Sequence, residues 1–278
     1  MNLCSKKQIK KILKEYNLAP IKKMGQNFLI NENDLHVFLD AADLKKEDVV
    51  LEIGPGLGVL TKELAKKVNK VIAVEKDRRL IPILKDIFSS FNNISLINED
   101  IRDIKIKEKK FKIVSNLPFY LTGFITRDLL EKEFKPDLIT IIIQKEMAER
   151  ICANPPNMSL ASLSVQFYGA PKKIKTLPKN HFYPPPNVAA NIVKIRLKDL
   201  KEDYGPVVAT KDFQKKLFKI ARIGFKHKRK KLINNLSNGL NLDKRKIKKI
   251  FDHSNLKEKQ RAETLKIKNW ILLTKALL

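Results

Sequence analysis

Short runs of β-branched residues alternate with segments of helical period over about 100 residues, beginning near residue 49. We predict strands at residues 49–53, 71–75, 94–97, 112–115 and 139–143, and helices at 59–68, 79–88 and 125–134. This alternation is typical of a parallel sheet whose strands are joined by helices. The pattern therefore predicts an α/β fold, in which the loops at the carboxyl edge of the sheet carry the functional residues.

The last third of the chain follows a different pattern. Apolar and basic residues alternate at 173–177 and 191–197, which predicts an antiparallel edge to the sheet. Residues 199–206 end in Gly205-Pro206, and we interpret them as a linker. Helical periods follow at 213–223, 229–236, 244–251 and 267–277. We expect a basic N-terminal helix over residues 1–20, an α/β domain over 21–200 and a basic helical domain over 201–278.

Positive charge is concentrated at the end of the chain. The formal net charge is +27, and residues 201–278 hold 22 Lys and Arg against 7 Asp and Glu. Such a surface attracts polyanions, because each neutralised phosphate releases condensed counterions. RNA, DNA and an anionic membrane all fit the charge alone, as does a surface that only keeps the protein in solution.

Several classes of protein are disfavoured. The apolar runs are far shorter than the ~20 residues that span a bilayer, and the first residues lack the apolar core of a secretory signal. Cys4 and Cys152 have no partner at metal-ligand spacing, so we expect no disulfide framework and no metal site. We therefore expect a reduced, cytoplasmic protein.

A glycine-rich turn follows the first predicted strand. Gly54, Gly56 and Gly58 would let the backbone pass close to a ligand, and Glu75 ends the next strand, where a carboxylate can accept both hydroxyls of a ribose. The spacing fits a nucleoside. Val59 stands where the dinucleotide fingerprint needs a small residue, which disfavours a nicotinamide cofactor, and no P-loop is present. A tight structural turn is the alternative reading.

The hexad Ser115-Asn116-Leu117-Pro118-Phe119-Tyr120 follows the fourth predicted strand. An exocyclic purine amine is a poor nucleophile, so a catalyst must hold it with hydrogen-bond acceptors. The Asn116 side-chain oxygen and the main-chain carbonyl exposed where Pro118 bends the chain after Leu117 can accept its two N–H groups. Phe119, or Tyr120, would stack on an extruded base, and Phe182, in a proline-rich loop, is a candidate for its other face. An Asn-capped turn with a buried aromatic is the structural alternative.

From about residue 20 to the end, these motifs resemble the small-subunit ribosomal RNA adenine dimethyltransferases, the KsgA-type family. The resemblance includes 25-GQNFL-29, which spacing alone would leave as a loop. It implies a class I, Rossmann-like methyltransferase domain followed by a small all-helical domain. It also implies that S-adenosyl-L-methionine contacts Gln26, Asn27, Leu29, Gly54, Gly56, Glu75, Asp100, Ile101 and Asn116.

The same resemblance implies a substrate. Two adjacent adenosines in the 3′-terminal hairpin of 16S rRNA would each receive two methyl groups, within an immature small ribosomal subunit. The erythromycin-resistance methylases of large-subunit RNA share the catalytic motifs, but the stretches 225-FKHKRKKLINNL-236 and 261-RAETL-265 resemble the small-subunit family. We expect RNA contacts at Arg222, Lys228, Arg229 and Lys230. We further expect a monomer with no membrane partner.

One further reading stays open from the sequence. A protein of this charge could act as a ribosome-assembly factor by occupying RNA, with methylation secondary. Four departures from the family pattern are Phe119 for Tyr, Ala190 for Ser, Glu99 for Gly, and a 154–162 segment without Tyr-Gly-Arg. None of them removes a residue that the proposed chemistry uses.

Overall fold

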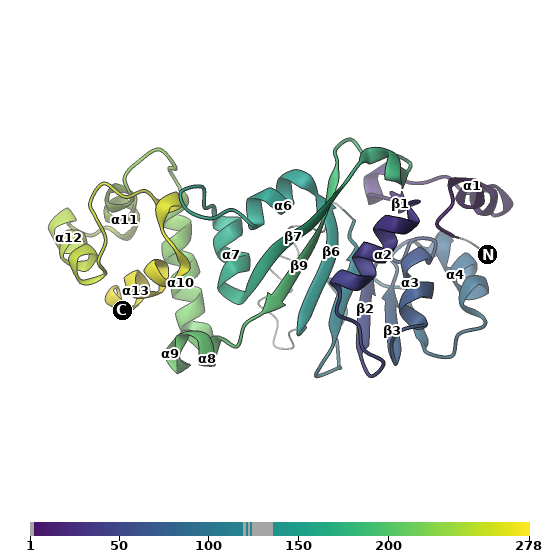
Figure 1. Cartoon of the computed structure of the whole chain (residues 1–278). Coiled ribbons are helices and arrows are strands. Elements are labelled where there is room, and N and C mark those ends of the chain that lie inside the picture. The colour runs from purple at the N-terminus through teal and green to yellow at the C-terminus, as the bar shows by residue number, and fades with distance from the viewer. Residues whose placement is uncertain (1–2, 119–120, 122, 124–135) are drawn as a thin grey trace. The chain divides into compact units, whose positions relative to one another are not determined.

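The computed structural model describes residues 3–118, 121, 123 and 136–278 of the 278-residue chain. The chain divides into two compact units (Figure 1). The first comprises Met1–Ala148 and Pro171–Leu197, and the second comprises Glu149–Ala170 and Lys198–Leu278. The expected boundary near residue 200 lies close to this division, but the sequence did not indicate that 149–170 belongs with the C-terminal helices.

The first unit is built on a seven-stranded sheet with the strand order β4-β3-β2-β5-β6-β9-β7. The pairs β3–β4, β2–β3, β2–β5 and β5–β6 are parallel, and β9 pairs with β6 in the antiparallel direction. The α/β, Rossmann-like fold is confirmed. The strands are β2 (Val49–Ile53), β3 (Lys70–Val74), β4 (Ile94–Ile97), β5 (Lys112–Asn116), β6 (Leu138–Gln144), β7 (Gly169–Leu177) and β9 (Ala190–Leu197).

Helices of the N-terminal half bury their apolar faces in one core with the sheet. The core joins residues of every helix in this group with Val50, Val71, Val114 and Ile142 of the strands. The helices are α1 (Lys6–Glu15), α2 (Glu32–Ala41), α3 (Val59–Ala65) and α4 (Ile81–Phe88), with short 3-10 turns at Lys22–Met24 and Arg78–Leu80. The helix predicted at 125–134 lies outside the described residues. No helix in the described part of the chain is long and apolar enough to cross a membrane.

A second sheet consists of β1 (Phe28–Leu29) and β8 (Phe182–Tyr183). The strands are antiparallel, with Phe28 opposite Tyr183 and Leu29 opposite Phe182. The sequence indicated a loop at both places. Two-residue strands show no periodicity, and their pairing joins segments more than 150 residues apart, so no local pattern could predict it.

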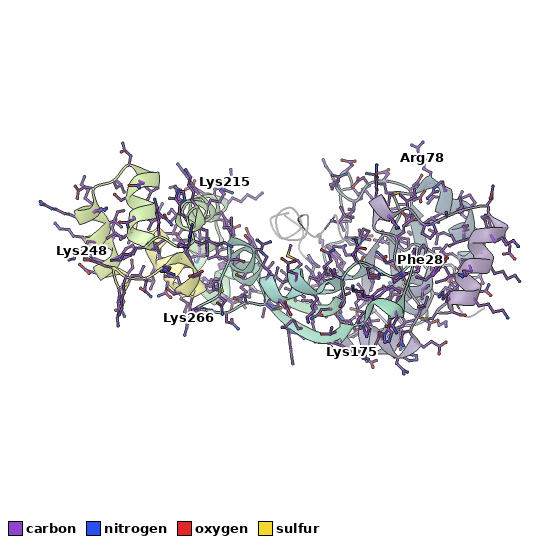
Figure 2. The ribbon with its side chains drawn as sticks, turned by 90° about the horizontal axis from the view of Figure 1, so that it is seen from above. Phe28, Arg78, Lys175, Lys215, Lys248 and Lys266 are labelled. Atoms are coloured by element: carbon purple, nitrogen blue, oxygen red, sulfur yellow. The ribbon has the colours of Figure 1, made fainter. Side chains whose placement is uncertain are left out.

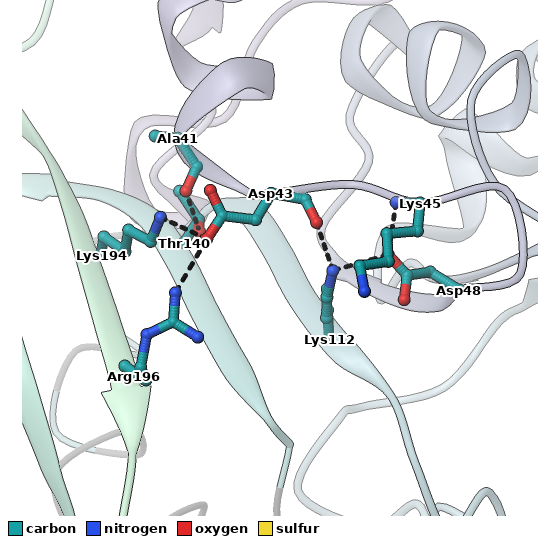
Figure 3. Close-up of polar contacts among 8 residues, drawn as sticks. All are labelled: Ala41, Asp43, Lys45, Asp48, Lys112, Thr140, Lys194 and Arg196. Carbon is teal, nitrogen blue, oxygen red and sulfur yellow. Dashed lines mark hydrogen bonds and ion pairs between the residues drawn. The ribbon is translucent and has the colours of Figure 1, made fainter.

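An ion-pair cluster ties the loop after α2 to β5 and β9 of the sheet (Figure 3). The Asp43 carboxylate lies 2.7 Å from the Lys194 ammonium and 2.9 Å from the Arg196 guanidinium, both on β9. Lys112 at the start of β5 donates to the Asp43 carbonyl and pairs with Asp48 at 2.7 Å. The hydrogen bond from Lys194, followed by the positive charges, lowers the pKa of Asp43.

The second unit is helical. Its helices are α7 (Leu160–Tyr168), α8 (Leu200–Tyr204), α9 (Pro206–Ala209), α10 (Lys211–Phe225), α11 (Leu232–Leu240), α12 (Lys244–His253) and α13 (Ile267–Ala276), while α6 (Lys145–Ile151) spans the division. The Phe167 and Tyr168 rings of α7 pack against Phe218 of α10 at centroid distances of 5.6 and 5.9 Å. Trp270 stacks on Phe225 at 5.4 Å. The contacts of Phe167 and Tyr168 with Phe218 explain why 149–170 joins the C-terminal helices.

Two predicted boundaries here are wrong. Residues 199–206 form α8 and the start of α9 rather than a linker, because the Asp199 carboxylate accepts hydrogen bonds from the Lys201 and Glu202 amides and so begins a helix. The helix predicted from residue 229 begins at Leu232 instead. Arg229 and Lys230 belong to the preceding turn, which the bond from the Lys230 amide to the His227 carbonyl closes.

Candidate active site

A cavity at the carboxyl ends of β2, β3 and β5 gathers the predicted cofactor residues. All nine line it, namely Gln26, Asn27, Leu29, Gly54, Gly56, Glu75, Asp100, Ile101 and Asn116. They come from five separate stretches of the sequence, all in the first unit. The structure thus places all nine predicted residues around one cavity. The contact of each residue with a cofactor stays a prediction.

The glycine turn forms the floor of the cavity. Gly54, Gly56 and Gly58 have φ values of +70°, +60° and +75°, in the left-handed region that favours glycine. A Cβ atom at Gly56 would lie 2.9 Å from the Phe28 ring, and one at Gly54 would lie 3.1 Å from Pro118. Glycine is therefore required both by the turn and by the two segments that close against it.

Glu75 lies directly after β3 and is 6% exposed. One carboxylate oxygen accepts the Gly56 amide at 3.2 Å, and the other accepts the Asp77 amide at 2.8 Å. Burial is the largest influence on this group and raises its pKa to about 7. Two backbone amides therefore hold Glu75 against the glycine turn, but they stabilise its negative charge only in part. Hydrogen bonds from the hydroxyls of a ligand would stabilise that charge further.

Glu52 is a cavity residue that the sequence reasoning did not select as a contact. It lies on β2, lines the cavity and is 1% exposed. Burial raises its pKa to about 8, and its Oε2 atom has no hydrogen-bond partner among the described residues. The sequence contains a signal for this residue, because an acidic residue inside the otherwise apolar run 49–53 is unusual for a buried strand and points to a functional role.

Asp100 and Ile101 lie at the end of the cavity lined by Lys76. The Asp100 carboxylate pairs with the Lys76 ammonium at 2.9 Å and with the Arg102 guanidinium at 2.6 Å. The hydrogen bond from Arg102, then that from Lys76, holds the pKa of Asp100 well below its usual range. Asp100 is therefore ionised throughout the physiological range and can accept a hydrogen bond from an amine. Glu99 also lines this part of the cavity.

The 25–29 segment reaches two walls of the cavity. The Gln26 side chain accepts the Ile21 amide at 2.7 Å and donates to Asp77 at 2.8 Å. The Asn27 carbonyl accepts a hydrogen bond of 2.9 Å from the side-chain nitrogen of Asn116. Leu29 is buried in β1. The segment therefore links the glycine-turn side of the cavity to the loop that carries the proposed catalytic residues.

The Asn116–Pro118 loop begins at the last residue of β5. Because the Asn116 amide nitrogen donates to Asn27, the oxygen of the same amide is the atom that can accept from an amine. Leu117 is buried and its amide donates to the Ile142 carbonyl at 3.1 Å. The Pro118 carbonyl accepts the Leu121 amide, which leaves the Leu117 carbonyl as the second candidate acceptor. Phe119 and Tyr120 lie outside the described residues.

Two groups of predicted residues lie outside the cavity wall. Phe182 does not line the cavity; it is 2% exposed and packs in the core of the first unit. Stacking of Phe182 on a base therefore stays a prediction that needs its ring to become accessible. Arg222 on α10 and residues 228–230 in the turn before α11 are exposed in the second unit. Their exposure is compatible with contacts to RNA phosphates.

The cavity suits a nucleoside that carries a positive charge. The Gly54–Gly56 turn lines the cavity, and Glu52 provides a buried oxygen with no partner among the described residues. Two buried carboxylates favour a cationic ligand. S-Adenosyl-L-methionine combines a ribose, an adenine amine and a sulfonium, so these residues fit it.

Comparisons with known proteins show the family of this chain. A sequence model of the family described as ribosomal RNA adenine dimethylase matches residues 18–273. The ribosomal RNA small subunit methyltransferase A of Dehalococcoides mccartyi is 40% identical over 96% of this chain and 91% of that protein. The protein of the same name from Clostridioides difficile is 36% identical over 98% of this chain and 96% of that protein.

Solved structures share the fold. The crystal structure of a dimethyladenosine transferase from Plasmodium falciparum superposes with a TM-score of 0.75, at 24% identity over 88% of this chain and 95% of that chain. That of the 23S rRNA methyltransferase ErmE gives 0.73, at 22% identity over 90% and 99%. With the family match over most of its length, this chain belongs to the ribosomal RNA adenine dimethylase family and is an S-adenosyl-L-methionine-dependent rRNA adenine dimethyltransferase.

Proposed function

We propose that this enzyme dimethylates two adjacent adenosines in the 3′-terminal hairpin of 16S rRNA, within an immature small ribosomal subunit, as a monomer in the cytoplasm. The single observation that supports the chemistry most directly is the fixed amide of Asn116, whose nitrogen is bonded to Asn27 beside the cofactor cavity. The small-subunit assignment draws on the names of relatives that are 35–41% identical over nearly the whole chain.

The proposed mechanism depends on how the target amine is held. The Asn116 side-chain oxygen and the Leu117 carbonyl each accept one N–H bond from the exocyclic amine, which directs the nitrogen lone pair toward the cavity. The cofactor supplies an electrophilic methyl group on its sulfonium. The adenine must leave its stack to reach Asn116, and an aromatic face stabilises the extruded base.

RNA affinity is assigned to exposed basic residues of both units. In the second unit these are Arg222 and residues 228–230. In the first unit, α1 buries Ile9, Ile12 and Leu13 and exposes its lysines. The Lys6 and Lys10 ammonium groups lie 5.9 and 5.7 Å from the centre of the Tyr183 ring, next to Phe182. These lysines are therefore near the loop proposed to contact the target base.

The test uses small ribosomal subunits from a strain that lacks this methylation. They are incubated with the enzyme and S-adenosyl-L-methionine, and the digested RNA is analysed by mass spectrometry. Dimethyladenosine at two neighbouring positions of the 3′ hairpin is the expected product. Dimethyladenosine in large-subunit RNA alone would reassign the substrate. Subunit binding without any product would favour an assembly factor that acts by occupancy.

The Asn116→Ala variant tests the mechanism. It removes the proposed acceptor, so transfer should fall by about a hundredfold or more, while cofactor affinity should change far less. Asn92→Ala, at an exposed position outside the cavity, is the matched control. Unchanged turnover of Asn116→Ala would exclude the assigned role.

A further inference from the structure

The β1–β8 sheet carries Phe28, which lines the cofactor cavity, and Phe182, the proposed base-stacking residue. Each of its two strands has only two residues. Besides the strand pairing, the Ile30 amide donates to the His181 carbonyl at 2.9 Å. A two-stranded ribbon of this length is marginal without further support. Side-chain contacts at its end must therefore contribute to holding the two segments together.

A buried ion cluster lies at that end, and we call Asp34, His181 and Lys175 the Asp34 clasp. Asp34 lies in the first turn of α2 and is fully buried. Its Oδ2 atom is 2.6 Å from the His181 Nδ1 atom, and its Oδ1 atom is 2.7 Å from the Lys175 ammonium on β7. Figure 2 labels Lys175 on its strand in the first unit. Since a carboxylate can only accept, the His181 Nδ1 carries the proton.

The clasp joins three elements that are distant in sequence. Asp34 and His181 are separated by 147 residues. The helix end favours a negative charge at this position, and the Asp34 amide also donates to the Asn31 side chain at 2.9 Å. A buried carboxylate is strongly unfavourable unless it is paired, so Asp34 requires the His181 and Lys175 side chains to stay where they are.

The clasp lies next to the strand that borders the cofactor cavity and next to the proposed base-stacking residue. In β1, Phe28 closes on the glycine turn, and the preceding Asn27 carbonyl orients the Asn116 amide. In β8, Phe182 directly follows His181 and pairs with Leu29. A shift of β8 away from β1 would therefore disturb the cofactor wall, the Asn116 amide and the proposed base-stacking aromatic together.

We propose that Asp34 is a positioning residue that, through His181 and Lys175, holds β8 on β1 and thereby aligns the cofactor wall with the Asn116 amide and Phe182. The part of this inference that concerns RNA rests on the proposed function. The part that concerns the cofactor wall does not, because Phe28 and Asn27 line the cavity itself.

The test compares three variants of the full-length protein. His181→Ala removes a partly exposed member of the clasp. Asp34→Asn keeps an oxygen that can accept from His181. The double variant shows whether the effects of the two substitutions depend on each other. His36→Ala is the matched control, because it removes an exposed histidine from the same helix as Asp34. Measurements are cofactor affinity by calorimetry without RNA, kcat and KM for small subunits, and the unfolding temperature.

We expect His181→Ala to weaken cofactor binding about threefold and to lower kcat/KM for RNA about tenfold, at temperatures where the variant is fully folded. Asp34→Asn keeps an oxygen that can accept from His181, so it should stay close to the wild type, and the double variant should match His181→Ala. A variant set in which only the unfolding temperature falls, with affinity and kcat/KM unchanged, would overturn the proposal.

The two proposals fail separately. If the wild type forms no dimethyladenosine in small-subunit RNA, the proposed function is wrong, and the clasp is still decided by cofactor affinity. If the wild type methylates the 3′ hairpin but His181→Ala binds cofactor and RNA like His36→Ala, the clasp proposal is wrong and the function stands.

Discussion

Glu75 predicts how cofactor affinity depends on pH. Burial raises its pKa to about 7, and the proposed role needs the ionised form, because both ribose hydroxyls donate to it. About a tenth of the protein is ionised at this position at pH 6, and about nine tenths at pH 8. Apparent affinity scales with the competent fraction, so the Glu75 contribution should strengthen binding roughly tenfold between these pH values.

The Glu75→Gln variant isolates this contribution. S-Adenosyl-L-methionine titrates in the same range, so calorimetric dissociation constants are compared as the ratio of variant to wild type at each pH. The ratio should rise about tenfold from pH 6 to pH 8, because glutamine cannot ionise. Glu47→Gln, on an exposed loop, should give a ratio near one throughout.

Unfolding must be excluded as the cause. Neutralising Glu75 removes a buried charge, which raises the free energy of unfolding by at most roughly 3 kcal/mol. A glutamine oxygen replaces only one of the two acceptors for the Gly56 and Asp77 amides, which lowers it by about 1–3 kcal/mol. The two effects nearly cancel, so urea midpoints should stay close. A ratio that does not change between pH 6 and pH 8 refutes the reasoning, whatever the stability.

Three further predictions concern the turn, the sheet edge and the basic surface. Gly56→Ala should weaken cofactor binding about tenfold by calorimetry, because φ is +60° and the new Cβ would lie 2.9 Å from Phe28; Phe28→Leu should restore part of the loss. Asp43→Asn should lower the free energy of unfolding by about 1 kcal/mol or less in urea titrations at pH 7. Because the pKa of Asp43 is lowered, chiefly by Lys194, this stabilisation is present above the unfolded-state value of 3.8 and is lost as the pH falls through the lowered value, so the variant and wild type should converge in acid. Replacing residues 228–230 by alanine should reduce the salt dependence of subunit binding by about one unit of slope for each phosphate that is no longer neutralised; an unchanged slope would remove these residues from the RNA surface.

The features that the sequence predicted are those with local causes. The left-handed backbone at Gly54 and Gly56 needs glycine whatever the rest of the chain does, and the parallel strands are visible as β-branched runs. The Asp199 cap was also readable, since aspartate directly before a helix is a common start signal. The linker prediction is wrong because Gly205-Pro206, a pair that commonly breaks helices and strands, lies here at the start of α9.

The features that the sequence missed depend on distant partners. No role for His181 follows from the sequence, because its partner Asp34 is 147 residues away and neither neighbourhood indicates a pair. The same holds for the β1–β8 sheet and for the place of α7 beside α10, where Phe167 and Tyr168 meet Phe218. Short strands and buried ion pairs carry no periodic signal, so only the folded arrangement identifies them.

Glu52 and Glu75 together explain why the cavity violates the rules that hold elsewhere in the sheet. Burial raises both pKa values, to about 8 and about 7, and each folded-state value exceeds the unfolded value of 4.5. The stability that each protonated group contributes is therefore present at acid pH and is lost as the pH rises through the folded value. A ligand that requires ionised Glu75 binds better in the same range, so cofactor should stabilise the protein more at pH 8 than at pH 6. The two buried carboxylates thus lower the stability of the unliganded protein at the pH values at which cofactor binding adds most stability. A binding site is expected to show this compromise, whereas a packing error is not.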